Sequence, residues 1–86
     1  MKYSVVWEEP AERRLADLWR LNPALRADIS AASDAIDLDL HDNPLTVGEP
    51  FSLRWRQIVR PPLAALFSVI EGDRLVRVVH VKFWDE

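Results

Sequence analysis

The segment Arg54–Pro62, RWRQIVRPP, places three arginines within seven positions of a short apolar stretch. An arginine guanidinium carries a rigid fork of donors that matches phosphate oxygens. Further along the chain, His80 and Lys82 lie two positions apart in the segment RLVRVVHVKFW. Histidine is the side chain that exchanges protons near neutral pH, and lysine adds a positive charge. These residue types predict a site for an anionic ligand, with a phosphate ester as the first candidate.

Cleavage of RNA by attack of the ribose 2′-OH fits such a site, because the reaction requires proton transfer and cations that stabilise the developing negative charge. For this chemistry we predict His80, Arg56 and Lys82 as the catalytic residues. The predicted substrate-binding residues are Arg54, Arg60, Arg77 and Trp84. Trp84 is included because an indole ring stacks on a base. The competing interpretation is a solvated strand face, with His80 as a structural strand residue and Trp84 packed against the fold.

The composition of the chain predicts one globular domain over residues 1–86, with a net charge of −3 and 49% hydrophobic residues. Residues 1–50 carry five basic and ten acidic groups, whereas residues 51–86 carry six basic and four acidic groups. This asymmetry favours an interaction surface in the second half. Because cysteine is absent and the two histidines are far apart, we expect no metal or other cofactor. No segment is apolar enough for a signal peptide or a membrane span, so we expect a cytoplasmic protein without a membrane partner.

Hydrophobic periodicity predicts six elements. In chain order they are a strand at 2–7, helices at about 8–21 and 23–41, and strands at 51–59, 63–70 and 74–84. Short turns join the last three strands, including Glu71-Gly72-Asp73, where Gly72 is able to take a positive φ. The result is an α+β fold of order β-α-α-β-β-β, with an antiparallel sheet and a helical hairpin on one face. Five aspartates of the second helix form either a solvated face or a counter-surface for a basic segment; they are Asp28, Asp34, Asp37, Asp39 and Asp42.

Strand alternation assigns side chains to the two faces of this sheet. The residues expected to pack against the helices are Phe51, Leu53, Trp55, Val59, Val79, Val81 and Phe83. The opposite, open face is then expected to collect Arg54, Arg56, Arg60, His80, Lys82 and Trp84. Strict alternation places Arg77 with the core residues, so its side of the sheet stays undecided. Leu66 and Ile70 would add apolar surface to the open face.

Several stretches of the chain together resemble the RelE/ParE superfamily of bacterial type II toxins. They are YSVVWEEPAERRLADLW, the pair Asn43-Pro44 followed by the loop Val47-Gly48-Glu49, and the strands RWRQIVRPPL, LAALFSVI and RLVRVVHVKFW. The resemblance covers nearly the whole chain and implies a RelE-like fold. It also implies a cytoplasmic toxin that a cognate antitoxin neutralises.

The resemblance implies one of two activities. RelE-like toxins cleave mRNA on the ribosome, and ParE-like toxins block DNA gyrase without hydrolytic chemistry. The positions that match the basic constellation of the cleaving members are Arg54 or Arg56, Arg60, Arg77 and His80, and Trp84 matches their aromatic residue near the C-terminus. This chain is acidic, and it has a tryptophan near its end where those toxins commonly have tyrosine. The sequence is therefore consistent with three hypotheses: an mRNA endoribonuclease, a non-enzymatic gyrase-binding toxin, or an inactive RelE-fold protein-binding module.

Overall fold

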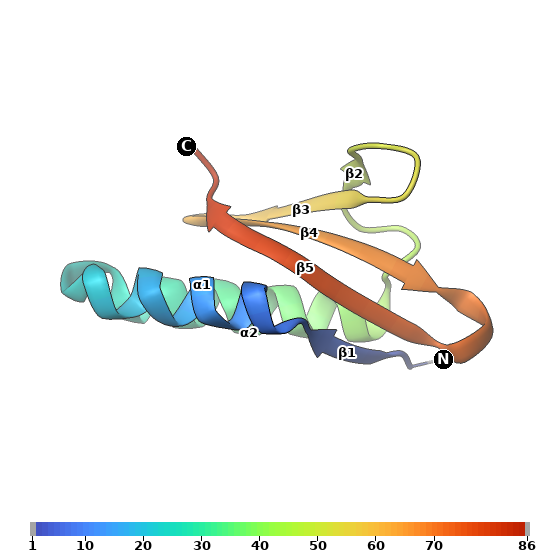
Figure 1. Ribbon diagram of the computed structural model, residues 1–86, viewed down its shortest axis with the longest axis horizontal. Coiled ribbons are helices and arrows are strands. Elements are labelled where there is room, and N and C mark those ends of the chain that lie inside the picture. The colour runs from blue at the N-terminus through green and yellow to red at the C-terminus, as the bar shows by residue number, and fades with distance from the viewer. Residues whose placement is uncertain (1, 86) are drawn as a thin grey trace.

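Two helices form one layer of the fold and a five-stranded sheet forms the other (Figure 1). The computed structural model describes residues 2–85. The elements are β1 (Ser4–Trp7), α1 (Glu9–Leu21), the 3₁₀ turn η1 (Pro23–Leu25), α2 (Arg26–Asp42), β2 (Glu49–Pro50), β3 (Arg56–Arg60), β4 (Leu63–Ile70), the 3₁₀ turn η2 (Glu71–Asp73) and β5 (Leu75–Phe83). This is the predicted α+β order with one additional short strand, β2.

The strands lie in the order β1-β5-β4-β3-β2. As predicted, β3, β4 and β5 form an antiparallel meander. The sheet is nevertheless mixed, because β1 pairs in parallel with β5. The long connection from β1 through the helices and back to the sheet allows this parallel pairing, which a short turn does not. Strand β2 was predicted as loop; it contains only two residues, one of them proline, and pairs with the start of β3.

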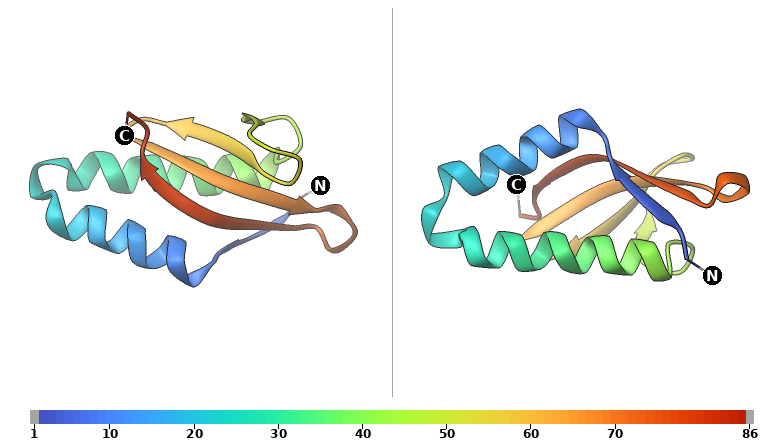
Figure 2. Two further views of the ribbon diagram at one scale, coloured as in Figure 1. Left: turned by 45° about the horizontal axis from the view of Figure 1, so that its top comes forward. Right: turned by 90° about the horizontal axis from the view of Figure 1, so that it is seen from below.

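The helices cover one face of the sheet, with α1 against β5 and α2 against β3 and β4. They diverge from their connection at η1, as the view from below shows (Figure 2). The apolar faces of the helices point inward, except that Trp19 on α1, expected in the core, is 43% exposed. The largest fully buried side chain of the core is Phe67 on β4. The helix residues of this core are Ala11, Leu18, Ile29, Ala32, Ile36 and Leu40. No helix within residues 2–85 is long and apolar enough to cross a membrane.

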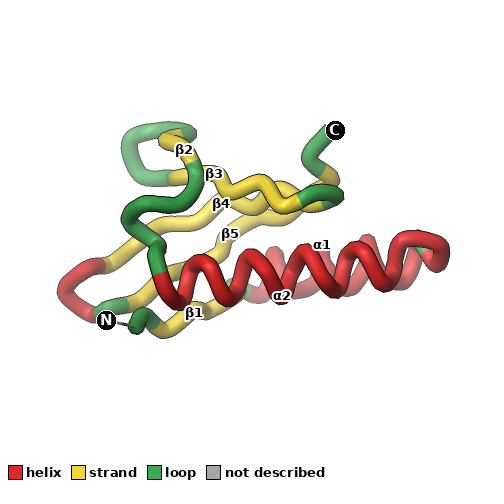
Figure 3. Tube along the Cα trace, turned by 180° about the vertical axis from the view of Figure 1, so that it is seen from behind, coloured by secondary structure: helices red, strands yellow, loops and turns green. Residues whose placement is uncertain are grey.

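The predicted orientation of the 51–59 segment is wrong. Ile58 is the fully buried residue of β3, whereas Val59 lies on the other face and is 36% exposed. Residues 51–55 form the loop between β2 and β3 (Figure 3), and the exposed fraction of Leu53 is 106%. The Phe51 amide donates to the Trp55 carbonyl across this loop at 2.9 Å. The apolar alternation therefore reflects a hairpin loop, which projects Phe51 and Leu53 away from the core.

This orientation predicts that truncating Leu53 has almost no effect on stability. Leu53→Ala should change the free energy of unfolding by less than about 0.5 kcal/mol, because the side chain is already in solvent. Ile58→Val, which removes one methyl group from the core, should cost about 0.5–1.5 kcal/mol. Urea denaturation of both variants measures the two values. A larger loss for Leu53→Ala than for Ile58→Val would contradict the assignment of the faces.

Candidate functional site

A β-bulge in β5 determines which side chains reach the open face, the face of the sheet away from the helices. Leu66 pairs with His80 and the next residue, Phe67, pairs with Val78, so Val79 has no partner in β4. The extra residue reverses the alternation of the strand. Val78 and Val81 are therefore both buried against the helices, while Arg77 and His80 are both exposed. The undecided side of Arg77 is thus the open face.

Two rows of side chains cross the open face through the paired strands. In the first row, Gln57 of β3 pairs with Leu66 of β4, which pairs with His80 of β5. The second row runs through Val59, Ala64 and Lys82 in the same way. In the first row a polar or basic side chain stands on each side of the apolar central strand, and in the second row Lys82 stands on the β5 side.

These rows enclose a small cavity, the open-face pocket, with a volume of about 220 Å³. It is lined by Phe51, Gln57, Ala64, Ala65, Leu66, His80 and Lys82. Phe51 reaches it from the β2–β3 loop, which rises above the sheet on the side away from the helices (Figure 1). The lining contains two basic side chains and one amide but no carboxylate. An anionic or neutral polar ligand therefore meets no like charge at this pocket.

Arg56 lies on the opposite face of the sheet from His80, which corrects its predicted position. It shares the helix-facing side of β3 with buried Ile58. Its guanidinium donates to the carbonyl of Val47, at 3.0 and 3.3 Å, and to the carbonyl of Gly48 at 2.9 Å. These bonds satisfy backbone acceptors in the loop between α2 and β2. The geometry gives Arg56 a structural contact and no direct access to the open-face pocket.

We expect Arg56→Met to lower stability, because the change removes charged hydrogen bonds and leaves loop carbonyls without their partner. The expected loss is about 1–3 kcal/mol in the free energy of unfolding. Arg54→Met is the matched control, since Arg54 lies exposed in the neighbouring loop. Chemical denaturation measures both variants. Equal stabilities of the Arg56 and Arg54 variants would refute the structural role of Arg56.

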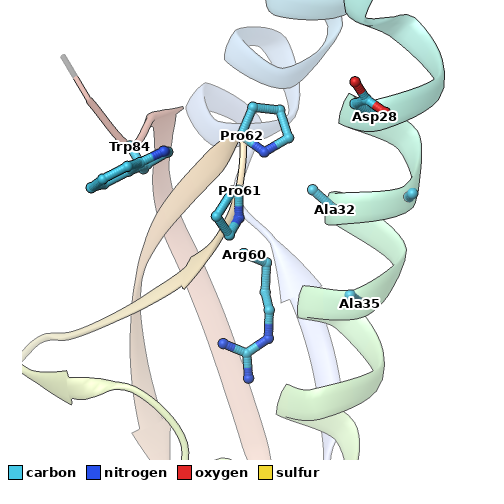
Figure 4. A pocket seen from close by; sticks show the side chains of 8 residues that line it. Asp28, Ala32, Ala35, Arg60, Pro61, Pro62 and Trp84 are labelled. Atoms are coloured by element: carbon cyan, nitrogen blue, oxygen red, sulfur yellow. The ribbon is translucent and has the colours of Figure 1, made fainter.

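Arg60 also points toward the helices and not toward the open face. Its Nε and Nη2 atoms lie 2.8 and 2.7 Å from Oδ2 of Asp39 on α2. Together with Pro61, Pro62 and Trp84 it lines a wide groove between α2 and the β3–β4 turn (Figure 4). The predicted grouping of Arg60 and Trp84 with His80 is therefore not formed. Trp84 itself is 53% exposed, and its amide donates to the Pro62 carbonyl at 3.0 Å.

Three aspartates in the C-terminal half of α2 form a counter-surface for groups of the same chain. Asp37 accepts a hydrogen bond from the Trp7 indole at 3.1 Å, and Asp39 binds Arg60. Asp42 accepts one from the Lys2 ammonium, which lowers the pKa of this carboxyl below its ordinary value of 3.8. These partners offset the unfavourable interaction of the acids with the helix dipole. They also explain why Arg60 is drawn to the helix side.

Lys2→Met should raise the pKa of Asp42 toward its ordinary value, because the lysine hydrogen bond is the main cause of the depression. The folded-state pKa lies below the unfolded one, so the pair stabilises the fold above pH 3.8. That contribution is lost as the pH falls through the lower folded value. Carboxyl NMR titration of the wild type and the variant measures the difference. Identical pKa values in the two proteins would exclude the pair.

The remaining predicted residues lie at the margins of the open face. Arg77 pairs with Glu8 at the start of α1, and its Nε lies 2.6 Å from the carboxylate. Arg54 is exposed in the loop between β2 and β3. Of the seven predicted site residues, the structure brings only His80 and Lys82 to the open-face pocket. Phe51 and Gln57 were missed, because Phe51 was assigned to the core and Gln57 was given no role.

Several solved structures have a fold similar to that of this chain. The chain matches the RelBE2 toxin–antitoxin complex of Mycobacterium tuberculosis with a TM-score of 0.79 and 21% identity, over 100% of this chain and 95% of that one. It matches the chromosomal ParDE toxin–antitoxin system of Pseudomonas aeruginosa with a TM-score of 0.70 and 16% identity, over 95% and 96%. For Escherichia coli toxin RelE the TM-score is 0.60 with 18% identity, over 96% and 84%. The protein therefore has the fold of RelE/ParE-type toxins.

The same fold also occurs as part of a longer protein. The chain matches TrmO of Pseudomonas aeruginosa with a TM-score of 0.63 and 23% identity, over 94% of this chain but 35% of that one. No protein-family model and no curated protein matches the sequence. Because one fold carries different functions, the activity has to be argued from the site.

Proposed function

We propose that this chain, with its RelE/ParE-type toxin fold, is the toxin of a type II toxin–antitoxin pair and cleaves mRNA on the ribosome through His80 and Lys82. The observation that carries the proposal is the open-face pocket, where both basic side chains line one cavity without a carboxylate. His80 is exposed and accessible to substrate. Histidine is also the residue type that most often transfers protons in catalysis.

In the proposed reaction His80 accepts the proton of a ribose 2′-OH, and the resulting oxygen attacks the adjacent phosphorus. The bond from phosphorus to the 5′-oxygen breaks, and that oxygen leaves with a proton from solvent. The products are a 2′,3′-cyclic phosphate and a free 5′-OH. Lys82 lies two positions along the same strand and stabilises the negative charge that develops on the phosphate oxygens. Arg56 and Arg60 take no part, since they lie on the other side of the sheet.

The proposal includes a cognate antitoxin that covers the open face. Leu66 forms the apolar floor of the pocket, and His80 and Lys82 beside it favour acidic residues on the antitoxin. Without such a cover the site is free to bind RNA.

Induced expression in a bacterial host tests the proposal, with growth and the incorporation of labelled amino acids and thymidine followed together. Growth should stop, and protein synthesis should fall before DNA synthesis. Unimpaired growth would contradict a toxin and favour an inactive RelE-fold module.

A second candidate function is a non-enzymatic toxin that binds a protein target such as DNA gyrase. The specific observation in its favour is the loss of free positive charge: Arg56, Arg60 and Arg77 are all engaged with groups of the same chain. RNA binding depends strongly on such charge, whereas protein binding does not. In the same experiment this candidate predicts that DNA synthesis fails first. Inhibition of supercoiling by the purified protein, with intact translation, would select it.

A further inference from the structure

We infer that the open-face pocket binds a single unstacked RNA base, with Phe51 as the stacking surface and Gln57 as the group that reads the edge of the base. The inference deepens the proposed ribonuclease function and rests on it for the identity of the ligand. It assigns a role to two residues that the proposed chemistry does not use.

The dimensions of the pocket suit one base. Neighbouring strands are about 4.8 Å apart, so the Gln57 and His80 backbones, separated by β4, stand about 10 Å apart. Leu66 forms the floor between them, and Phe51 forms a wall on the side of β3. The volume of about 220 Å³ is below the roughly 300–1,000 Å³ of pockets for drug-sized ligands. The space therefore fits a single flat ring system better than a larger ligand.

The chemistry of the lining favours a base over an apolar side chain of a protein. An aromatic ring provides a stacking surface for any base, and the Gln57 amide offers both a donor and an acceptor for its edge. A buried apolar side chain would pack on the ring but would leave the Gln57 amide without a hydrogen-bond partner. His80 and Lys82 stand on the opposite side of the pocket, where they would meet the ribose 2′-hydroxyl and the phosphate of the same nucleotide. Each group of a nucleotide thus has a matching group in the pocket.

Phe51 is well placed for this role because it contributes little to the core. It is 60% exposed, and its backbone hydrogen bond to Trp55 does not depend on the ring. Sequence-specific recognition of RNA commonly uses unstacked bases that lie on aromatic side chains and form hydrogen bonds with their edges. A base held here next to His80 would give the cleavage a preference at one nucleotide position.

The test is an NMR titration of the full-length protein at fixed salt with four heptaribonucleotides. They are oligouridines whose central nucleotide is A, C, G or U. The wild type should bind the four with different dissociation constants. Phe51→Ala should weaken binding of the preferred oligonucleotide about ten-fold or more, the effect of losing one stacked base. Gln57→Ala should bring the four dissociation constants closer together, while Phe51→Tyr keeps the wild-type affinity.

Leu53→Ala is the matched control, because it removes an exposed apolar side chain from the same loop without touching the pocket. Its affinity should stay within about two-fold of the wild type. Equal binding of all four oligonucleotides, unaffected by Phe51→Ala, would overturn the inference and favour a protein contact at the pocket. So would equal losses for the Phe51 and Leu53 variants.

The failure of the inference is distinguishable from the failure of the proposed function. If the wild type is toxic but binds the four oligonucleotides equally, the base pocket is refuted while the toxin role stands. If binding is base-selective and depends on Phe51 but induction leaves growth unaffected, the base pocket is supported and the toxin role is refuted.

Discussion

Replacing His80 by alanine should abolish toxicity while leaving the fold intact. The side chain lies exposed on the open face, so its removal creates no cavity in the core. Loss of a positioned proton-transfer group lowers a reaction rate by about 10²–10⁴-fold. We therefore expect cells that express His80→Ala to grow like uninduced cells, and cleavage of mRNA to fall by that factor. Thermal unfolding of the purified variant should match the wild type within a few degrees.

The other histidine provides the matched control for this variant. His41, at the end of α2, contacts the Tyr3 carbonyl through Nδ1 at 2.6 Å and thereby holds β1 to the helix. His41→Ala should lower stability but retain toxicity at a temperature where the variant is folded. If His80→Ala remains as toxic as the wild type, the assignment of His80 to the reaction is wrong. The same conclusion follows if only the His41 variant loses toxicity while folded.

The largest loss of stability should come from Gly48→Ala. Gly48 has a φ of 75°, in the left-handed region that disfavours residues with a Cβ. An added Cβ would also lie 2.5 Å from the Gln57 carbonyl oxygen and 3.1 Å from its carbon, and both are backbone atoms of β3. Conformational strain and the clash together should cost about 2–5 kcal/mol. For a domain of this size each kcal/mol lowers the melting temperature by roughly 4–8 °C.

Gly72→Ala is the control for the Gly48 variant. Within residues 2–85, and apart from Gly72 and its two chain neighbours, no heavy atom lies within 4 Å of the position of its added Cβ, and its φ is outside the left-handed region. Its melting temperature should stay close to that of the wild type. Equal melting temperatures of the Gly48 and Gly72 variants would contradict the described backbone. The turn does not use the freedom of Gly72 to take a positive φ, because Arg74 takes one instead, with a φ of 49°.

A substitution at Gly48 should affect both the stability of the fold and the shape of the open-face pocket. The Gly48 carbonyl accepts a hydrogen bond from Arg56, and the backbone that this glycine touches belongs to Gln57, whose side chain lines the open-face pocket. A displacement of β3 by a Cβ at this position should therefore disturb the pocket as well as the fold. In partly folded preparations of Gly48→Ala, RNA binding should be weaker than the folded fraction alone explains.

The helices and the meander could be predicted from the sequence because their apolar spacing has one interpretation. The stripe of α2, from Ile29 to Leu40, has only one buried face. The segment Phe51–Val59 has two interpretations, since apolar residues alternate in it whether or not it is one strand. The hydrogen bond from the Phe51 amide to the Trp55 carbonyl closes this stretch into a loop. The strand therefore begins after the loop, and Ile58 is its buried core residue.

The bulge in β5 could not be read from the sequence, since valines at 76, 78, 79 and 81 fit the core in either phase of alternation. The sequence also does not indicate which arginines form ion pairs with carboxylates of the same chain. Arg60 binds an aspartate 21 positions away, and Arg77 binds a glutamate 69 positions away. Such pairs depend on the tertiary fold. The first pair takes Arg60 to the helix side of the sheet, and the second engages Arg77 at the margin of the open face.

The most direct test of the proposed site is to map the 5′ ends of cellular RNA shortly after induction of the wild type and of His80→Ala. In cells with the wild type, new 5′ ends that carry a 5′-hydroxyl should appear within translated mRNAs. These ends should be absent in cells with the variant at equal protein levels. Intact mRNA in cells whose growth has stopped would contradict cleavage at the open face.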